Sequence, residues 1–342
     1  MVELRNSELV FSFPDIHRSA SMRVQLQRTL RIPDDGKTWP LPPGLGRFPI
    51  AHVDDHAAHA PRDWLARGGV MVPMYQSEAL WLQFSGTHDA RRGVTYPFAV
   101  KIAAGRINAV DGEPWADGLS AGAQDYVVVP EQPWLDGFSV EKGTIRQFVA
   151  MPLGSGYSAE EQLTGAAEFG GLQIQVYPMR KEVYERRFPV RPPPPPRAAR
   201  AEAMMMPCAP GAAMGLAPGG RMKQTIERDP YGRLDWDTSA RGRCFVHLCN
   251  ALAWRGITGT NPPSTPISAK EYTRAGLPWY AWYGDDDAAL AGSARLGGLR
   301  SVSEMAKVKG DAPPHDGECD APEKITELRA GLRPGQVREG RW

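Results

Sequence analysis

The chain has 342 residues and a net charge of +1, so it carries no large excess of basic residues for binding nucleic acid or anionic lipid. Its hydrophobic content of 42% is enough for a core that needs neither disulfides nor metal ions. The 36 glycines and 32 prolines are typical of a β-rich chain with many turns and argue against an all-helical fold.

The amino-acid sequence shows no targeting or membrane-spanning signal. The first 15 residues contain three acidic side chains and no long apolar core, which is unlike a secretory signal. No apolar run approaches the roughly 20 residues that span a bilayer. The four cysteines are too few and too scattered for a disulfide framework. We therefore expect a soluble, cytoplasmic protein with no membrane partner.

Alternation of apolar and polar residues predicts most strands of the first half. Residues 22–32 give the cleanest case, with Val24, Leu26, Leu30 and Ile32 on one face. Further strands are predicted in the apolar runs between glycine- and proline-rich turns. They cover residues 70–74, 79–84, 98–102, 106–110, 126–129, 145–153 and 172–177.

Residues 126–154 form the most apolar stretch, and the pattern predicts two strands joined by a loop at the centre of the fold. About eight strands precede residue 178, at spacings that suit an antiparallel sandwich or a barrel. Ser158 and Glu161 have the spacing of a capping box and predict the start of a short helix.

Proline-rich residues predict a division of the chain. Residues 191–197 read RPPPPPR, and residues 198–220 are mainly Ala, Met, Gly and Pro. We expect a β-rich α+β domain, a linker, a small mixed α+β unit that docks back on the domain, and a charged tail. The corresponding ranges are 1–190, 191–220, 221–310 and 311–342.

The C-terminal third is harder to interpret. Residues 242–258 are apolar, and the pattern does not distinguish strand from helix there. Cap and glycine signals predict helices at 265–276 and after Ser301. Further short helices are predicted at 285–296 and 322–328.

Three of the seven histidines fall within eight residues and suggest a metal site. If residues 52–59 are helical, His52, Asp55, His56 and His59 share one face, with Asp54 beside them. Imidazole and carboxylate ligands suit Zn or another first-row divalent ion. The alternative is a solvated polar segment, because four ligands from two helical turns seldom converge on one ion. No other cofactor is indicated.

Two other segments are weaker candidates for ligand binding. Gly154, Ser155 and Gly156 follow a strand and precede a helix cap, where backbone N–H groups can hold an anion, although an ordinary strand-to-helix turn is the favoured interpretation. Cys244, His247 and Cys249 carry metal-binding atoms, but no second ligand pair stands at zinc-finger spacing.

A run of aromatic residues near the C-terminal end suggests stacking against a sugar ring or a partner side chain. These residues are Trp279, Tyr280, Trp282 and Tyr283. Their alternative role is to pack the C-terminal unit onto the first domain.

Known catalytic motifs are missing from the sequence: it contains no Gly-x-Ser-x-Gly elbow, no P-loop and no dinucleotide-binding fingerprint. Asp125, Glu131 and Asp136 lie near strand ends and have the chemistry of an acid–base pair, but the sequence does not place them together.

Five phrases of the sequence resemble those of a family of uncharacterised bacterial proteins. They are GLG at 44–46, MYQSEALW at 74–81, QPWLDG at 132–137, RQFVAMPLG at 146–154 and GLPW at 276–279. The resemblance covers most of the chain and implies no activity, cofactor or catalytic residue.

These observations favour a binding or structural protein with a protein partner or self-association. The alternatives are a metal-dependent hydrolase that uses the His52–His59 cluster and a carbohydrate-binding module that uses Trp279 and Trp282.

Overall fold

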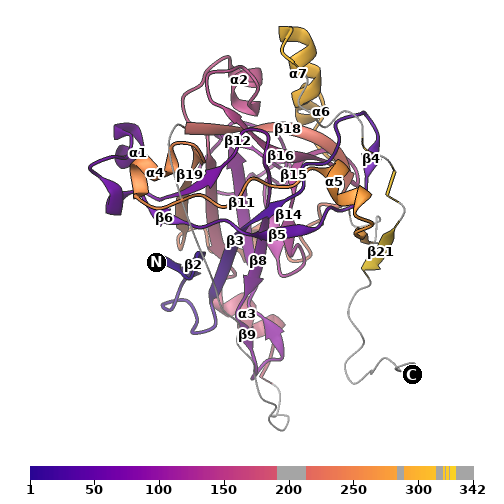
Figure 1. Cartoon of the computed structure of the whole chain (residues 1–342). Helices are drawn as coiled ribbons and strands as arrows, with labels where there is room; N and C mark the ends of the chain where they lie inside the picture. The colour runs from indigo at the N-terminus through magenta and orange to yellow at the C-terminus, as the bar shows by residue number, and fades with distance from the viewer. Residues whose placement is uncertain (191–212, 283–288, 313–318, 320, 323, 329–342) are drawn as a thin grey trace, which may run out of the picture.

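The computed structural model describes residues 1–342 except 191–212, 283–288, 313–318, 320, 323 and 329–342 (Figure 1). Strands account for 38% of the chain and helices for 17%. Most strand pairs are antiparallel. The predicted β-rich α+β class is therefore confirmed.

One large sheet system contains most of the strands. They are β1 Val2–Arg5, β2 Glu8–Ser12, β3 Ser21–Thr29, β4 Thr38–Trp39, β5 Gly44–Arg47, β6 Ala51–His52, β7 Val70–Met74, β8 Ala79–Gly86, β11 Phe98–Ala104, β12 Ile107–Asn108, β13 Val127–Val129, β14 Trp134–Leu135, β15 Gly137–Glu141, β16 Thr144–Pro152, β17 Leu172–Pro178, β18 Ala213–Lys223 and β19 Gly242–Asn250. Two small sheets pair β9 His88–Asp89 with β10 Val94–Thr95, and β20 Trp279–Trp282 with β21 Ile325–Leu328.

The helices are short and lie around the sheets (Figure 1). They are α1 Arg62–Arg67, α2 Ala159–Thr164, α3 Lys181–Arg187, α4 Trp254–Thr258, α5 Ala269–Arg274, α6 Ala294–Gly297 and α7 Val302–Lys309, with 3-10 turns η1 Asp54–His56 and η2 Arg233–Asp235. In the part of the chain that the structure describes, no helix has both the length and the apolar character needed to cross a membrane.

Two runs of paired strands enclose one core. One run is β2–β3–β8–β16–β18, and the other is β7–β19–β17–β11–β13. They are joined where β18 pairs with β19. Leu26 and Leu82 from the first run share a core with Ile102, Ile174 and Val246 from the second. The arrangement is sandwich-like, because apolar faces from both runs meet inside.

Strand β3 shows why the pattern of its residues forms a half-buried strand. Met22, Val24 and Leu26 have no exposed surface, whereas Arg23 between them is exposed. Side chains alternate across a strand, so the apolar set enters the core and the polar set stays outside. The predicted strand forms, but it ends at Thr29 and does not include Leu30 and Ile32.

The prediction that the two strands within residues 126–154 pair with each other is wrong. Both strands exist, but β13 pairs with β11, and β16 pairs with β15, β8 and β18. Sequence neighbours did not pair because β14 and β15 occupy the intervening chain. By contrast, the strands predicted at 98–102 and 106–110 do pair, as the hairpin of β11 and β12, with Ala103 opposite Asn108 and Ala104 opposite Ile107.

The chain on either side of residues 191–212 belongs to the same sheet system. β18 lies against β16 through eight residue pairs from Thr144 to Pro152, and β19 lies against β17. The predicted linker therefore extends too far, since its residues 213–220 are part of β18. The proline run at 191–197 lies outside the described residues.

The C-terminal third settles one alternative that the sequence left open and differs from several predicted helices. Of the helix predicted at 285–296, only the part that begins at Ala294 is helical among the described residues, as α6. Residues 242–258 contain both alternatives, because β19 is followed by α4. The helix predicted at 265–276 is α5, which begins later, after the capping box of Ser268 and Glu271. Residues 325–328 form the strand β21 against β20, where a helix was predicted.

Candidate functional site

A cavity of about 320 Å³ lies between the outer face of β8 and the segment that contains β20. We call it the aromatic pocket. Its lining residues are Leu41, Pro42, Pro43, Gly44, Trp81, Trp134, Asp136 and Tyr280. A volume of this size lies at the lower end of the range typical of small-molecule sites.

Strand alternation positions the two indole rings. On β8, Leu80 and Leu82 are buried in the core, so Trp81 between them faces outward and is half-buried. The short strand β14 pairs with β8 and places Trp134 opposite Gln83. Both rings therefore lie on the outer side of the same sheet.

Tyr280 comes from the far end of the chain and is held by backbone hydrogen bonds. Its N–H donates to the carbonyl of Leu41 at 3.0 Å, and the N–H of Leu41 donates to the carbonyl of Tyr280 at 2.8 Å. The preceding Trp279 is fully buried, with its ring 5.4 Å from that of Trp39. These contacts place Tyr280 at the rim of the pocket.

Asp136 supplies the only carboxyl group among the described lining residues. Gln224 holds it in two ways: its Nε2 donates to Oδ2 of Asp136 at 2.6 Å, and its Oε1 accepts from the Asp136 N–H at 2.9 Å. Burial raises the pKa of Asp136 to about 7, while hydrogen bonds from Gln224 and Trp134 act in the opposite direction.

The sheet face beside the pocket carries three glutamines whose amides bond to one another. Gln27 Nε2 donates to Gln25 Oε1 at 2.8 Å and to Gln83 Oε1 at 3.0 Å. Gln25 in turn donates to Glu8, which also pairs with Arg47. This network satisfies its own polar groups and leaves the aromatic pocket mainly apolar.

The structure does not bring the predicted metal ligands together. His52 lies in β6, and only Asp54–His56 form a helical turn, so the expected common helix face does not exist. The side chains of His52, Asp54, Asp55 and His59 are exposed. Among the described residues, no group of three His, Cys, Asp or Glu is placed to hold a metal ion.

The predicted anion site is a turn in which the N–H groups of Ser155 and Gly156 are already used. The N–H of Ser155 donates to the carbonyl of Pro152 at 3.3 Å, and that of Gly156 donates to Oε1 of Glu161 at 2.6 Å. Glu161 also completes the predicted capping box with Ser158. Gly154 has a positive φ that the turn requires.

The predicted aromatic run divides between core and pocket. Trp279 is in the core and Tyr280 lines the pocket. Trp282 lies in β20, and Tyr283 lies outside the described residues. Trp81 and Trp134 were not predicted as site residues, and the sequence signal for them was their position at outward-facing places in or beside strands.

His247 has a structural position between two rings. Its imidazole stacks on Trp64 and Phe245, with ring centroids 4.8 and 4.3 Å away, and its Nε2 lies 3.0 Å from the carbonyl of Gly68. Burial lowers the pKa of His247 to about 4, so the ring is neutral near pH 7.

A scan against protein-family models, a search of curated proteins and a search of solved structures each returned no match to this chain. The geometry of the pocket therefore carries the functional argument alone.

Proposed function

We propose that this protein is a binding protein for an organic cation, with a quaternary or methylated ammonium group seated in the aromatic pocket. The observation that carries this proposal is the combination of Trp81, Trp134 and Tyr280 with one carboxyl group, that of Asp136. Among the described lining residues there is no Lys, Arg or His.

Aromatic faces attract cations because the ring quadrupole is negative above the ring. A methylated ammonium also loses little hydration when it enters an apolar cavity, since its methyl groups form few hydrogen bonds. The carboxylate of Asp136 supplies the balancing charge. An anionic ligand would meet repulsion there and no positive side chain in return.

A sugar fits the pocket less well than a cation. Sugar hydroxyls need several hydrogen-bonding partners, and most of the lining is Pro, Leu and Trp. The neighbouring amides of Gln25, Gln27 and Gln83 are already bonded to one another. The carbohydrate-binding alternative is therefore an outcome of the test described next.

The test compares choline with its uncharged isostere 3,3-dimethyl-1-butanol by isothermal titration calorimetry at pH 8. The two molecules have nearly the same shape, so a difference reports the positive charge. We expect choline to bind at least about tenfold more tightly, the value of a desolvated cation–π contact. Equal affinities, or saturable binding of glucose-based oligosaccharides without binding of choline, would contradict the proposal.

Two variants and a matched control locate the site. Trp81→Leu removes one ring, and Gly44→Leu places a side chain in the cavity, because a Cβ at Gly44 lies 3.9 Å from the Trp81 ring. Both should abolish choline binding. Trp115→Phe changes a half-buried Trp outside the pocket and should leave binding unchanged.

A further inference from the structure

A second cavity, of about 540 Å³, lies on the outer face of β17 and β19. We call it the arginine pocket. Its lining residues are Arg67, Gly69, Arg106, Trp115, Asp117, Phe169, Gln173, Ile174, Arg243, Cys244 and Phe245. It shares no lining residue with the aromatic pocket.

The floor of this pocket is a sheet face that contributes Gln173, Arg243 and Phe245 to the lining, whereas Gln175 and Lys101 are buried on the same face and do not line the pocket. Gln173 pairs with Phe245, and Gln175 pairs with Arg243 on one side and Lys101 on the other. Since residues two apart on a strand share a face, these side chains lie on the same surface.

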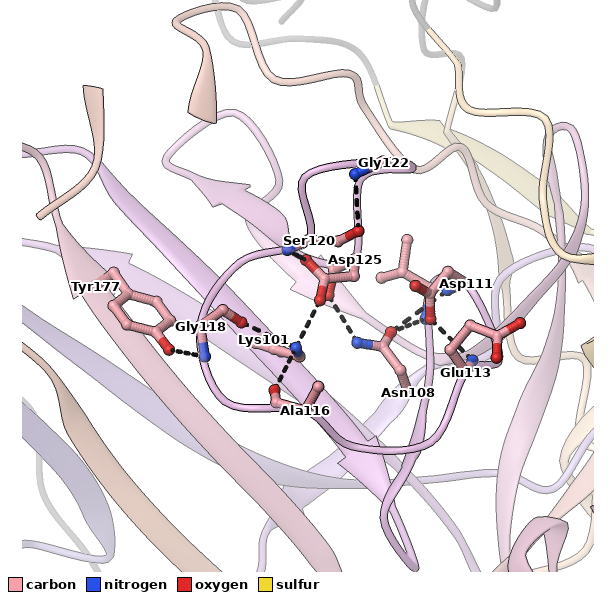
Figure 2. A network of polar contacts seen from close by, with 11 residues as sticks. Lys101, Asn108, Asp111, Glu113, Ala116, Gly118, Ser120, Gly122, Asp125 and Tyr177 are labelled. Atoms are coloured by element: carbon pink, nitrogen blue, oxygen red, sulfur yellow. Dashed lines mark hydrogen bonds and ion pairs between the residues drawn. The ribbon is translucent and has the colours of Figure 1, made fainter. Parts of the chain in front are cut away.

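The loop that follows β12 forms one wall, and a buried lysine holds it there. Lys101 Nζ donates to the carbonyls of Ala116 and Gly118 at 2.7 and 2.9 Å and pairs with Asp125 Oδ2 at 2.5 Å (Figure 2). The hydroxyl of Tyr177 accepts from the Gly118 N–H at 3.0 Å. Trp115 and Asp117 are thereby fixed beside the sheet face.

Two guanidinium groups lie against the ring of Phe169. Their Cζ atoms are 5.1 Å (Arg67) and 4.9 Å (Arg106) from its centroid. Arg106 reaches this position from the tip of the β11–β12 hairpin, where φ is +60°. Arg67 also donates to the carbonyls of Glu168 and Phe169, at 2.9 and 3.5 Å. A guanidinium group can bind a phosphate or a carboxylate through two parallel hydrogen bonds.

The lining has an excess of positive charge. Three arginines against one aspartate leave a net charge of +2. Asp117 lies 3.5 Å from Arg243 and 3.2 Å from Arg241, so a carboxylate of the protein already occupies part of this positive region.

Gln175 is an unsatisfied polar group on the same sheet face as the pocket floor, although it is not one of the lining residues. Its side chain is fully buried, and neither Oε1 nor Nε2 has a hydrogen-bond partner among the described residues. An unpaired buried amide costs about 1–3 kcal/mol in protein stability. An unsatisfied buried group of this kind in a folded protein calls for a specific structural or functional explanation.

We propose that the arginine pocket is a second ligand site that binds a small molecule through a phosphate group. A phosphate dianion balances the +2 charge of the lining, and its oxygens match the forked donors of Arg106 and Arg243. The volume admits a phosphorylated metabolite of moderate size.

The test is calorimetric titration with inorganic phosphate, pyrophosphate and succinate at low ionic strength. The intact protein should bind the phosphate probes saturably and succinate at least about tenfold more weakly. One phosphate group brings its negative charge and several acceptor oxygens to the same place, whereas the two carboxylates of succinate lie apart. The Arg106→Met, Arg243→Met double variant keeps the apolar stems and should lose phosphate binding by about tenfold or more.

Two variants that each remove one negative charge distinguish an effect within the arginine pocket from an effect of charge nearby. Asp117→Asn should tighten pyrophosphate binding by about threefold, because it removes a nearby like charge. Glu113→Gln makes the same charge change on the same loop but removes a pairing with Arg295 outside the pocket, so it should leave affinity unchanged. Absence of saturable phosphate binding, equal binding by the folded double variant, or a preference for succinate would overturn the proposal.

Discussion

At the residue scale, Asp136 is the clearest case of chemistry set by its surroundings. Its carboxyl group is buried, and the reciprocal contact with Gln224 fixes it without supplying a positive charge. Loss of hydration therefore affects the pKa of Asp136 more than the hydrogen bonds do, and the carboxyl group titrates near neutral pH. A cation in the pocket supplies the missing charge and favours the ionised form.

Choline affinity should consequently depend on pH. Because only the ionised carboxylate attracts the ligand, affinity should rise as pH increases from about 6 to 8, through the raised pKa of Asp136. Calorimetric titrations across this range measure the effect. In Asp136→Asn the dependence should vanish and affinity should fall, and a flat profile in the unchanged protein would contradict the proposed role.

The same group affects folding in the absence of ligand. Its folded pKa is raised, so its contribution to stability is complete below the unfolded value near 3.8 and is lost as pH rises through about 7. His247 has the opposite effect over an overlapping pH range. Its folded pKa is lowered, so its contribution to the free energy of unfolding increases as pH rises. The difference in unfolding free energy between Asp136→Asn and the unchanged protein should therefore increase from pH 4 to 8, as measured by urea denaturation.

Gln175 offers a further prediction at this scale. Gln175→Met conserves volume and removes two unsatisfied polar atoms, so it should raise the free energy of unfolding by about 1 kcal/mol. Gln173→Met is the control: it removes the acceptor for the Arg106 N–H and the donor to the carbonyl of Gly170, and it should destabilise. Thermal and urea unfolding measure both changes, and a destabilised Gln175→Met would argue against an unsatisfied amide.

At the element scale, buried side chains hold the loops that surround the arginine pocket. Lys101 holds the loop after β12, and Glu160 accepts N–H donors from Glu168, Phe169 and Gly170 on the opposite side. Each charged group thus satisfies several backbone groups that no sheet pairing satisfies.

Lys101→Met should destabilise the protein by about 3–5 kcal/mol, because it leaves Asp125 buried without its cation. Lys142→Met, at an exposed position, should change stability by less than about 0.5 kcal/mol. Urea denaturation measures both. Hydrogen exchange should also show faster exchange at Gly118 and Ser120 in Lys101→Met, and unchanged exchange there would contradict the assigned role of the lysine.

At the scale of the whole molecule, the C-terminal segment completes the aromatic pocket. Trp279 anchors this segment in the core beside Trp39, and Tyr272 packs edge-on against Trp279 with ring centroids 6.3 Å apart. Trp279, which anchors the segment, and Tyr280, which lines the pocket, are therefore adjacent in the strand and their side chains point in opposite directions.

Variants of these two neighbours should separate anchoring from binding. Trp279→Ala should lower the free energy of unfolding by about 3–5 kcal/mol and weaken choline binding. Tyr280→Ala should weaken choline binding with a much smaller loss of stability, since its ring is only half-buried. Unfolding curves and titrations measure the two effects, and equal destabilisation by both variants would contradict this division.

Local signals in the sequence determined the strand-rich class, the alternation of β3, the β11–β12 hairpin and the capping boxes at Ser158 and Ser301, because each depends on residues within a few positions of one another. Only the tertiary structure decided that β13 pairs with β11 and that β18 and β19 continue the sheet system, since these pairings join distant segments. The aromatic pocket has the same origin. Its residues come from positions 41–44, 81, 134–136 and 280, and no sequence spacing records that they meet. The His52–His59 cluster is the converse case, in which closeness in sequence did not produce convergence of side chains.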